Sequence, residues 1–113
     1  MASAVAGRLS AIRRRSSLKD REVALLIDAT PTTVSRWQTG KTEPQPDKLQ
    51  RLLTLEWLVE QLGQFYPDPA EARLWLFSRH KALGGATPAE RIQEGKVDDV
   101  LAVIAQIEDG AYV

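Results

Sequence analysis

The chain has 113 residues, 43% of them hydrophobic, with fifteen basic residues, fifteen acidic residues and no cysteine. The hydrophobic content excludes a disordered chain, and the missing cysteines exclude a disulfide scaffold, a thiolate zinc site and a cysteine nucleophile. No apolar run reaches membrane length and residues 1–7 lack the features of a signal peptide, so we expect a cytoplasmic protein with one domain, or two small lobes sharing a core.

The net charge of zero hides an uneven distribution along the chain. Residues 1–51 carry ten cations and five anions, whereas residues 52–113 carry five cations and ten anions. The first part therefore has a net charge of +5 and the second a net charge of −5. Such an asymmetry between halves indicates a portion that faces nucleic acid.

Every element of the chain is predicted to be helical, because no stretch combines apolar alternation with β-branched residues. Three short helices are expected at about residues 5–14, 20–27 and 31–39. Thr30 is placed to cap the third helix, with Pro31 as its first residue. The turn-rich stretch 40–46 then separates a domain at 1–45 from a second domain at 46–113.

Residues 20–39 have the pattern of a helix-turn-helix, two short helices joined by a tight turn. The positions that must pack inward are apolar or small throughout the motif. Asp28 holds the turn position that is usually glycine, and aspartate tolerates the left-handed conformation better than most residues. The inward residues are Val23, Ala24, Ile27, Ala29, Val34 and Trp37.

The second helix of this motif is predicted to read DNA. Hydroxyl side chains allow a close approach to phosphates and bases, and Arg36 has the length and geometry to contact guanine. Lys41 and the cluster at residues 13–15 are candidates for phosphate contacts. An ordinary two-helix corner with solvated basic residues is the alternative. The predicted DNA-binding residues are Thr30, Thr32, Thr33, Ser35, Arg36, Gln38 and Lys41.

A long helix is expected at about residues 47–65, with more apolar positions than one core-facing stripe needs. Leu55, Trp57 and Leu58 widen its apolar surface, which indicates either a dimer interface or a helix buried within its own chain. Another helix is expected at about 70–78, capped by Asp68. Its apolar run at residues 74–77 is predicted to lie deep in the core.

Two further helices are expected near the end of the chain. Thr87 and Glu90 have the spacing of a capping box, and the short helix after them ends at Gly95. The last helix covers about residues 97–109, with Gly110 in its left-handed cap position. The segment 110–113 is either a frayed terminus or an insertable plug with an aromatic anchor and a terminal carboxylate.

No catalytic or metal-binding constellation is evident in the second half, so we do not expect an enzyme, a cofactor or a metal. His80 is the sole histidine, and a lone histidine in a loop is more often structural or solvent-facing than a ligand. Gly84 and Gly85 lack both the spacing and the preceding strand of a phosphate loop.

The sequence resembles the Xre/MbcA/ParS-type antitoxins of bacterial toxin–antitoxin pairs. An Xre-like helix-turn-helix carries the N-terminal resemblance, and a pattern typical of the family's toxin-binding domain carries the C-terminal one. One departure is the stretch at residues 78–81, where the family commonly has a Pro-Asn pair. The matching residues are Val34-Ser35-Arg36-Trp37, Gly40, Trp75-Leu76, Ala82-Leu83-Gly84-Gly85, Thr87-Pro88-Ala89-Glu90, Gly95, Val100 and Gly110-Ala111-Tyr112.

The resemblance implies an all-α protein with a helix-turn-helix bundle, a long helix and a small toxin-binding lobe. It also implies a RES-domain toxin that degrades NAD as the partner, a toxin active site blocked by the antitoxin's last residues, and repression of the antitoxin's own operon. A free-standing Xre-like repressor with a C-terminal dimerisation lobe is the alternative. On this chain the blocking residues would be Gly110, Ala111, Tyr112 and Val113.

Overall fold

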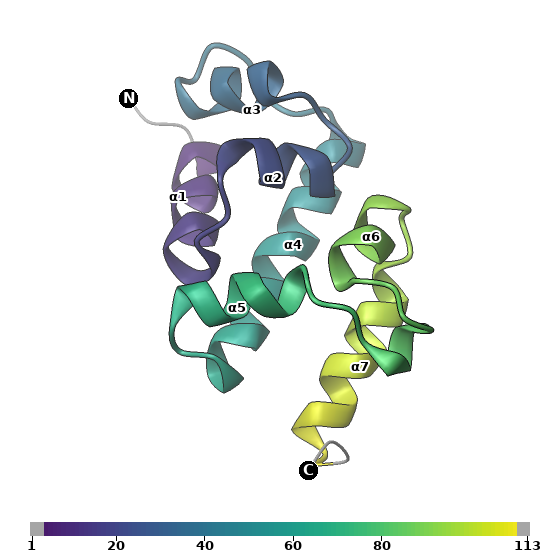
Figure 1. Ribbon diagram of the computed structural model, residues 1–113. Helices are drawn as coiled ribbons and strands as arrows, with labels where there is room; N and C mark the ends of the chain where they lie inside the picture. The colour runs from purple at the N-terminus through teal and green to yellow at the C-terminus, as the bar shows by residue number, and fades with distance from the viewer. Residues whose placement is uncertain (1–3, 111–113) are drawn as a thin grey trace.

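Residues 4–110, which the computed structural model describes, form seven α-helices and one short 3₁₀ turn without any strand (Figure 1). This confirms the predicted all-α class. Each predicted helix is present, and its ends lie within two residues of the predicted ones. The elements are α1 (Ala4–Ser16), α2 (Asp20–Leu26), α3 (Pro31–Gln38), α4 (Pro46–Phe65), α5 (Pro69–Leu76), η1 (Lys81–Leu83), α6 (Pro88–Gln93) and α7 (Val97–Glu108).

Three helices begin at the side-chain caps that the sequence predicts. The cap hydroxyl or carboxylate accepts a backbone N–H of the first turn, from Thr33 to Thr30 (3.1 Å), from Ala70 to Asp68 (3.0 Å) and from Glu90 to Thr87 (3.0 Å). A proline occupies the first turn of all three helices, where its missing N–H costs nothing. These caps fix the start of α3, α5 and α6 independently of tertiary packing.

Helix α4 forms the centre of the hydrophobic core, with α1, α5 and α7 packed against it. Its buried side chains lie on one stripe, and Leu49 and Leu53 are half-buried beside that stripe. The stripe consists of Leu52, Leu55, Leu58, Val59 and Leu62.

The prediction of a dimer interface is wrong for Leu55 and Leu58, which are 2% and 0% exposed in the single chain. Both side chains fill the chain's own core, which was the alternative. Trp57 lies on the opposite side of α4 and is 48% exposed. At about 100° per residue it is turned away from the buried stripe.

The prediction that residues 74–77 all lie in the core is wrong for Leu74, which is 66% exposed. Helix α5 presents only one side to the core, through Ala72, Trp75 and Leu76. At about 100° per residue, Leu74 is about 200° from Ala72 and therefore faces outward. A run of four apolar residues cannot all face inward on a helix that packs on one side.

One hydrophobic cluster extends from Leu9 in α1 to Ile104 in α7. It crosses the predicted domain boundary at residue 45, because α1 packs on both α4 and α5, and α2 packs on α6. Figure 1 shows α2 above α5, with α6 and α7 beside them. The division into 1–45 and 46–113 stays a prediction within a molecule that has one continuous core.

Candidate functional sites

Helices α2 and α3 have the packing of a helix-turn-helix. Val23, Ala24, Ile27, Val34 and Trp37 are buried as predicted, and Ala29 is half-buried against the same core. The small side chain at position 24 lets the two helices approach each other, and α3 returns two apolar residues at i, i+3 to the core. The inward half of the motif is therefore confirmed.

The turn between these helices is stabilised from outside the motif. Asp28 adopts a φ of +59°, the left-handed region expected from its position. The N–H of Ala29 donates to the carbonyl oxygen of Ala24 at 2.8 Å. The Lys48 ammonium donates to the main-chain carbonyls of Ile27 and Asp28 and lies 3.6 Å from the Asp28 carboxylate. Lys48 thus links the start of α4 to this turn.

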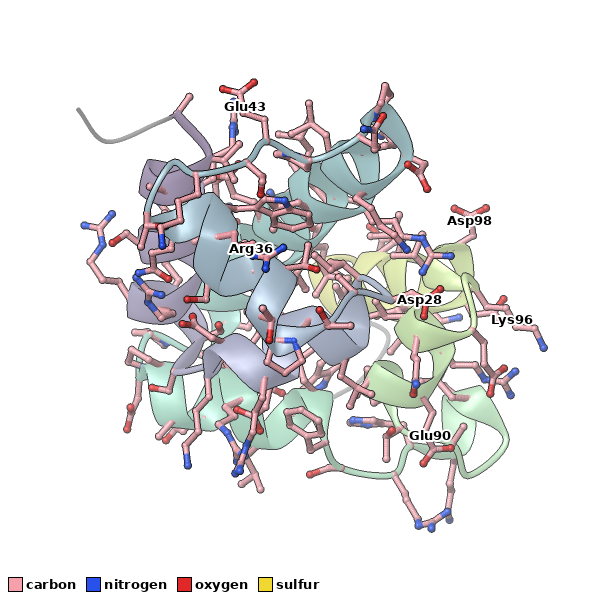
Figure 2. All side chains as sticks on the ribbon, turned by 90° about the horizontal axis from the view of Figure 1, so that it is seen from above. Asp28, Arg36, Glu43, Glu90, Lys96 and Asp98 are labelled. Atoms are coloured by element: carbon pink, nitrogen blue, oxygen red, sulfur yellow. The ribbon has the colours of Figure 1, made fainter. Side chains whose placement is uncertain are left out.

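The outward side of α3 presents Thr32, Ser35 and Arg36 to solvent, and Lys41 lies exposed just beyond the helix. Within residues 4–110, no hydrogen bond or ion pair engages the Arg36 guanidinium. Figure 2, which views the molecule from above, shows the Arg36 side chain on the surface of α3. Short hydroxyls around one long cationic donor are suited to close contact with a DNA groove.

The remaining predicted DNA-binding side chains make contacts within the protein. The hydroxyls of Thr30 and Thr33 lie 2.8 Å apart and close the N-terminal cap of α3. Arg13 donates to the side-chain oxygen of Gln38 at 2.7 Å and to Asp20 at 2.7 Å. Arg13 therefore links α1, α2 and α3, and its partner Gln38 is held toward α1.

The basic cluster at residues 13–15 is only partly available for phosphate. Arg13 makes the two contacts just described, and Arg15 forms an ion pair of 3.5 Å with Glu60 of α4. Arg14 is exposed. A cation already paired with a carboxylate gains less from a phosphate than a solvated one, because the contact must first be broken.

Glu22 is a buried carboxylate that sequence reasoning missed. It accepts two hydrogen bonds from Arg73 of α5, one of them at 3.3 Å from Nε, and a third from the backbone N–H of Lys19 at 2.9 Å. Burial alone would raise the pKa of Glu22, but these hydrogen bonds and the charges of Arg73 and Lys19 outweigh it and lower the pKa. The pair joins the helix-turn-helix to the second half of the chain.

An apolar groove of about 340 Å³ lies along α5 and the loop after it. Leu74 is the most exposed large hydrophobic side chain described, ahead of Trp57 and of Leu25, which is 45% exposed. The rings of His80 and Trp75 are tilted by 44° with centroids 4.9 Å apart, and His80 Nε2 lies 3.0 Å from the Trp75 carbonyl oxygen. The groove is lined by Tyr66, Glu71, Leu74, Trp75, Ser78 and His80.

The predicted plug lies almost entirely outside the described residues. Gly110 has a φ of +74° and ends α7 in the left-handed conformation, as the sequence predicts. Ala111, Tyr112 and Val113 lie beyond residue 110, where the description ends.

Among residues 4–110, no three histidine, aspartate or glutamate side chains come together in a way that could hold a metal ion. In the same part of the chain, no helix has the length and apolar character needed to cross a membrane.

Comparison with known proteins places this geometry in a family. Residues 61–110 match the model of the Xre/MbcA/ParS antitoxin C-terminal toxin-binding domain. The whole chain is 33% identical to the mycobacterial cidal antitoxin MbcA of Mycobacterium bovis and to that of Mycobacterium tuberculosis, over 96% of their length. A chain of the crystal structure of the M. tuberculosis MbcT–MbcA toxin–antitoxin complex superposes with a TM-score of 0.82 at 31% identity, covering 98% of this chain and 99% of that one.

Proposed function

This chain belongs to the Xre/MbcA/ParS family of antitoxins, and we propose that it neutralises a RES-domain toxin that degrades NAD and represses its own operon. The observation that carries the toxin-binding part is the position of Leu74. Among residues 4–110, the most exposed large apolar side chain lies inside the stretch, residues 61–110, that matches a toxin-binding domain. An exposed apolar side chain beside a groove is typical of a protein–protein contact.

We assign the first contact with the toxin to the groove along α5. Tyr66, Leu74 and Trp75 offer an apolar anchor point, and aromatic residues are enriched in the centres of such interfaces. Glu71 and His80 at its edge provide the polar rim. The net charge of −5 on residues 52–113 favours approach to a cleft that binds the anionic pyrophosphate of NAD and is therefore cationic.

In this proposal the last residues of the chain complete the blockage of the toxin's active site. Gly110 follows the end of α7, and the segment 110–113 adds an aromatic side chain and a carboxylate beyond it. We propose that this segment occupies the active site of the toxin, as the family resemblance implies. The protein itself acts without catalysis and without a cofactor, in the cytoplasm where its toxin and its operator are found.

Repression is assigned to the outward side of α3. Thr32, Ser35, Arg36 and Lys41 form the reading surface, while Thr30, Thr33 and Gln38 hold the helix in place. Two-fold operators require two copies of such a surface. Trp57 is the remaining candidate for a contact between two copies, because Leu55 and Leu58 are buried.

A plain repressor whose second half only dimerises is the alternative function. Co-expression with the product of the adjacent reading frame separates the two. We expect that product to be toxic alone and harmless together with this chain. We expect Leu74→Asp to lose protection. Leu25→Asp, at another exposed leucine, on α2 and outside residues 61–110, should keep it.

The protection assay has three informative outcomes. Loss of protection with Leu74→Asp, in a protein that stays folded by circular dichroism, supports the groove as the docking site. Full protection by a chain lacking residues 110–113 would contradict the plug and leave neutralisation to the helices. If no adjacent reading frame encodes a toxic product, the plain repressor would be favoured.

A further inference from the structure

A second cavity, of about 190 Å³, lies between the helix-turn-helix and the C-terminal helices and is open to solvent on one side. Its apolar lining comes from Leu26 of α2, from Leu55 and Leu58 of α4, and from Ile92 and Val97 at the two ends of the α6–α7 connection. Neither the reading surface of α3 nor the groove along α5 includes any of these residues. The polar lining comes from Gln50, Arg51 and Thr54.

Arg51 gives this cavity an unusual chemistry. Its Nη1 is buried and finds no hydrogen-bond acceptor among residues 4–110, and its side chain forms no ion pair within them. Its Nη2 lies 3.5 Å from the point where a Cβ on Gly95 would stand, so the guanidinium lies against the backbone of the α6–α7 turn. Arg51 as a whole is half-buried, and buried polar atoms such as its Nη1 almost always have a hydrogen-bond partner in proteins.

A ligand that combines an anion with an apolar body fits this lining, because its anion can accept from Nη1 while its apolar part contacts the aliphatic side chains. A guanidinium presents a planar fork of N–H donors that fits a carboxylate in a bidentate manner. The leucine, isoleucine and valine walls exclude a fully hydrated anion such as phosphate. An engineered apolar cavity of about 150 Å³ accommodates benzene, which has six non-hydrogen atoms. A space of about 190 Å³ therefore accepts about seven or eight non-hydrogen atoms, the size of a six-carbon monocarboxylate.

We propose that this cavity binds a short aliphatic monocarboxylate, with its carboxylate paired to Arg51 and its alkyl chain between Leu26, Leu55 and Val97. The ligand would touch α2 on one side and the α6–α7 connection on the other. Its occupancy would therefore stabilise the packing of the helix-turn-helix on the C-terminal helices. This assignment does not depend on the toxin or on the operator.

The test is a titration of the full chain with hexanoate, followed by two-dimensional amide NMR and by thermal unfolding. We expect the amide signals of Gln50, Gly95 and Val97 to shift with saturation, and the melting temperature to rise with ligand concentration. Hexan-1-ol has the same chain without the charge, and acetate has the charge without the chain. Both should bind at least about tenfold more weakly than hexanoate, because a charge-assisted hydrogen bond and the buried methylenes each contribute at least that much.

Two variants keep this proposal falsifiable. Arg51→Met retains the stem and removes the charge, and it should reduce the affinity for hexanoate to that for hexan-1-ol. Arg21→Met, at an exposed cation of α2, should leave hexanoate binding unchanged. Absence of shifts at the three amides with the unmodified chain would overturn the proposal. So would equal hexanoate affinities in the chain with Arg51→Met and the unmodified chain, or tighter binding of inorganic phosphate than of hexanoate.

Discussion

The basic half and the acidic half of the chain use their charged side chains differently. In residues 4–51, at least four of the ten cations are held in ion pairs with carboxylates, two of them with acids of α4 in the other half. In the second half, Arg73 reaches back to Glu22 of the first. The charge split along the sequence therefore helps to hold the two halves together. The pairs with Glu56 and Glu60 make the uncompensated charge of the first half smaller than +5, while Arg36 and Lys41 at α3 stay exposed.

The turns of the two halves differ as well. In the second half, every positive φ among the described residues belongs to a glycine, at positions 84, 85, 95 and 110. In the first half, Ser17 and Asp28 adopt positive φ with full side chains, at 55° and 59°. Ser17 directly follows α1 and Asp28 lies in the turn between α2 and α3, so the first half contains the backbone conformations that are least favourable for an L-amino acid.

Removal of the Trp37 side chain tests whether the halves share one cooperative core. Because Trp37 is buried beneath α3 in the continuous cluster, Trp37→Ala should lower the free energy of unfolding by about 3–5 kcal/mol. Chemical denaturation followed by fluorescence and by circular dichroism should give one coincident transition. An early transition confined to residues 1–45 by hydrogen exchange would instead show that the halves unfold separately and would support the predicted domain boundary.

Removal of the Arg36 side chain tests the reading surface alone. Arg36→Ala should abolish sequence-specific binding, with a loss of about 1–3 kcal/mol on the operator and a much smaller loss on random DNA. Fluorescence anisotropy with both duplexes at several salt concentrations measures the difference. Arg21→Ala is the control at another exposed cation of the same half. Unchanged operator affinity after Arg36→Ala would exclude α3 as the specific reader.

Acid titration tests the link between the halves. Since the folded pKa of Glu22 is below its ordinary value of 4.5, ionised Glu22 stabilises the fold at higher pH. That contribution should be lost as the pH falls below about 4.5 and through the lowered pKa. Glu22→Gln should lower the free energy of unfolding at pH 7 by about 1–2 kcal/mol, a value that allows for the partly exposed Arg73. It should also make the free energy of unfolding less dependent on pH in the acid range. A curve with the same acid slope in both proteins would contradict the assignment.

Sequence periodicity and capping signals predict the helices well, because both are local. Thr30, Asp68 and Thr87 cap their helices as expected, and the inward residues of the helix-turn-helix are buried. Asp28 also takes the backbone conformation of the glycine that usually occupies its place. These features depend on residues that are at most a few positions apart, so a single sequence is sufficient to predict them.

The features that escaped sequence reasoning depend on long-range contacts. Glu22 and Arg73 are 51 positions apart, and neither shows a local pattern that would pair them. The basic neighbours of Arg13 predict a phosphate contact, whereas the fold places Asp20 and Gln38 beside its guanidinium. The apolar run around Leu74 gave no sign of which side of α5 faces the core. The packing of α5 against α1 decides which side of α5 faces the core. It therefore also decides that Leu74, the candidate toxin contact, is exposed.

The smallest expected effect concerns the turn that distinguishes the halves. Asp28→Gly relieves a left-handed conformation that is costly for a residue with a side chain. It also raises the conformational entropy of the unfolded chain, which lowers the free energy of unfolding by about 0.5–1 kcal/mol. The ion pair with Lys48 is exposed and contributes little, while the hydrogen bonds from Lys48 to the main-chain carbonyls remain. The net change should therefore lie between zero and about 1 kcal/mol of stabilisation. Asp28→Asn, which keeps the tolerance for positive φ and removes the charge, isolates the ion pair. Thermal unfolding of both variants gives the comparison. Asp28→Gly could instead clearly destabilise the protein while Asp28→Asn does not. That result would show that the turn depends on the backbone restriction that a side chain imposes at position 28, and not on the charge there.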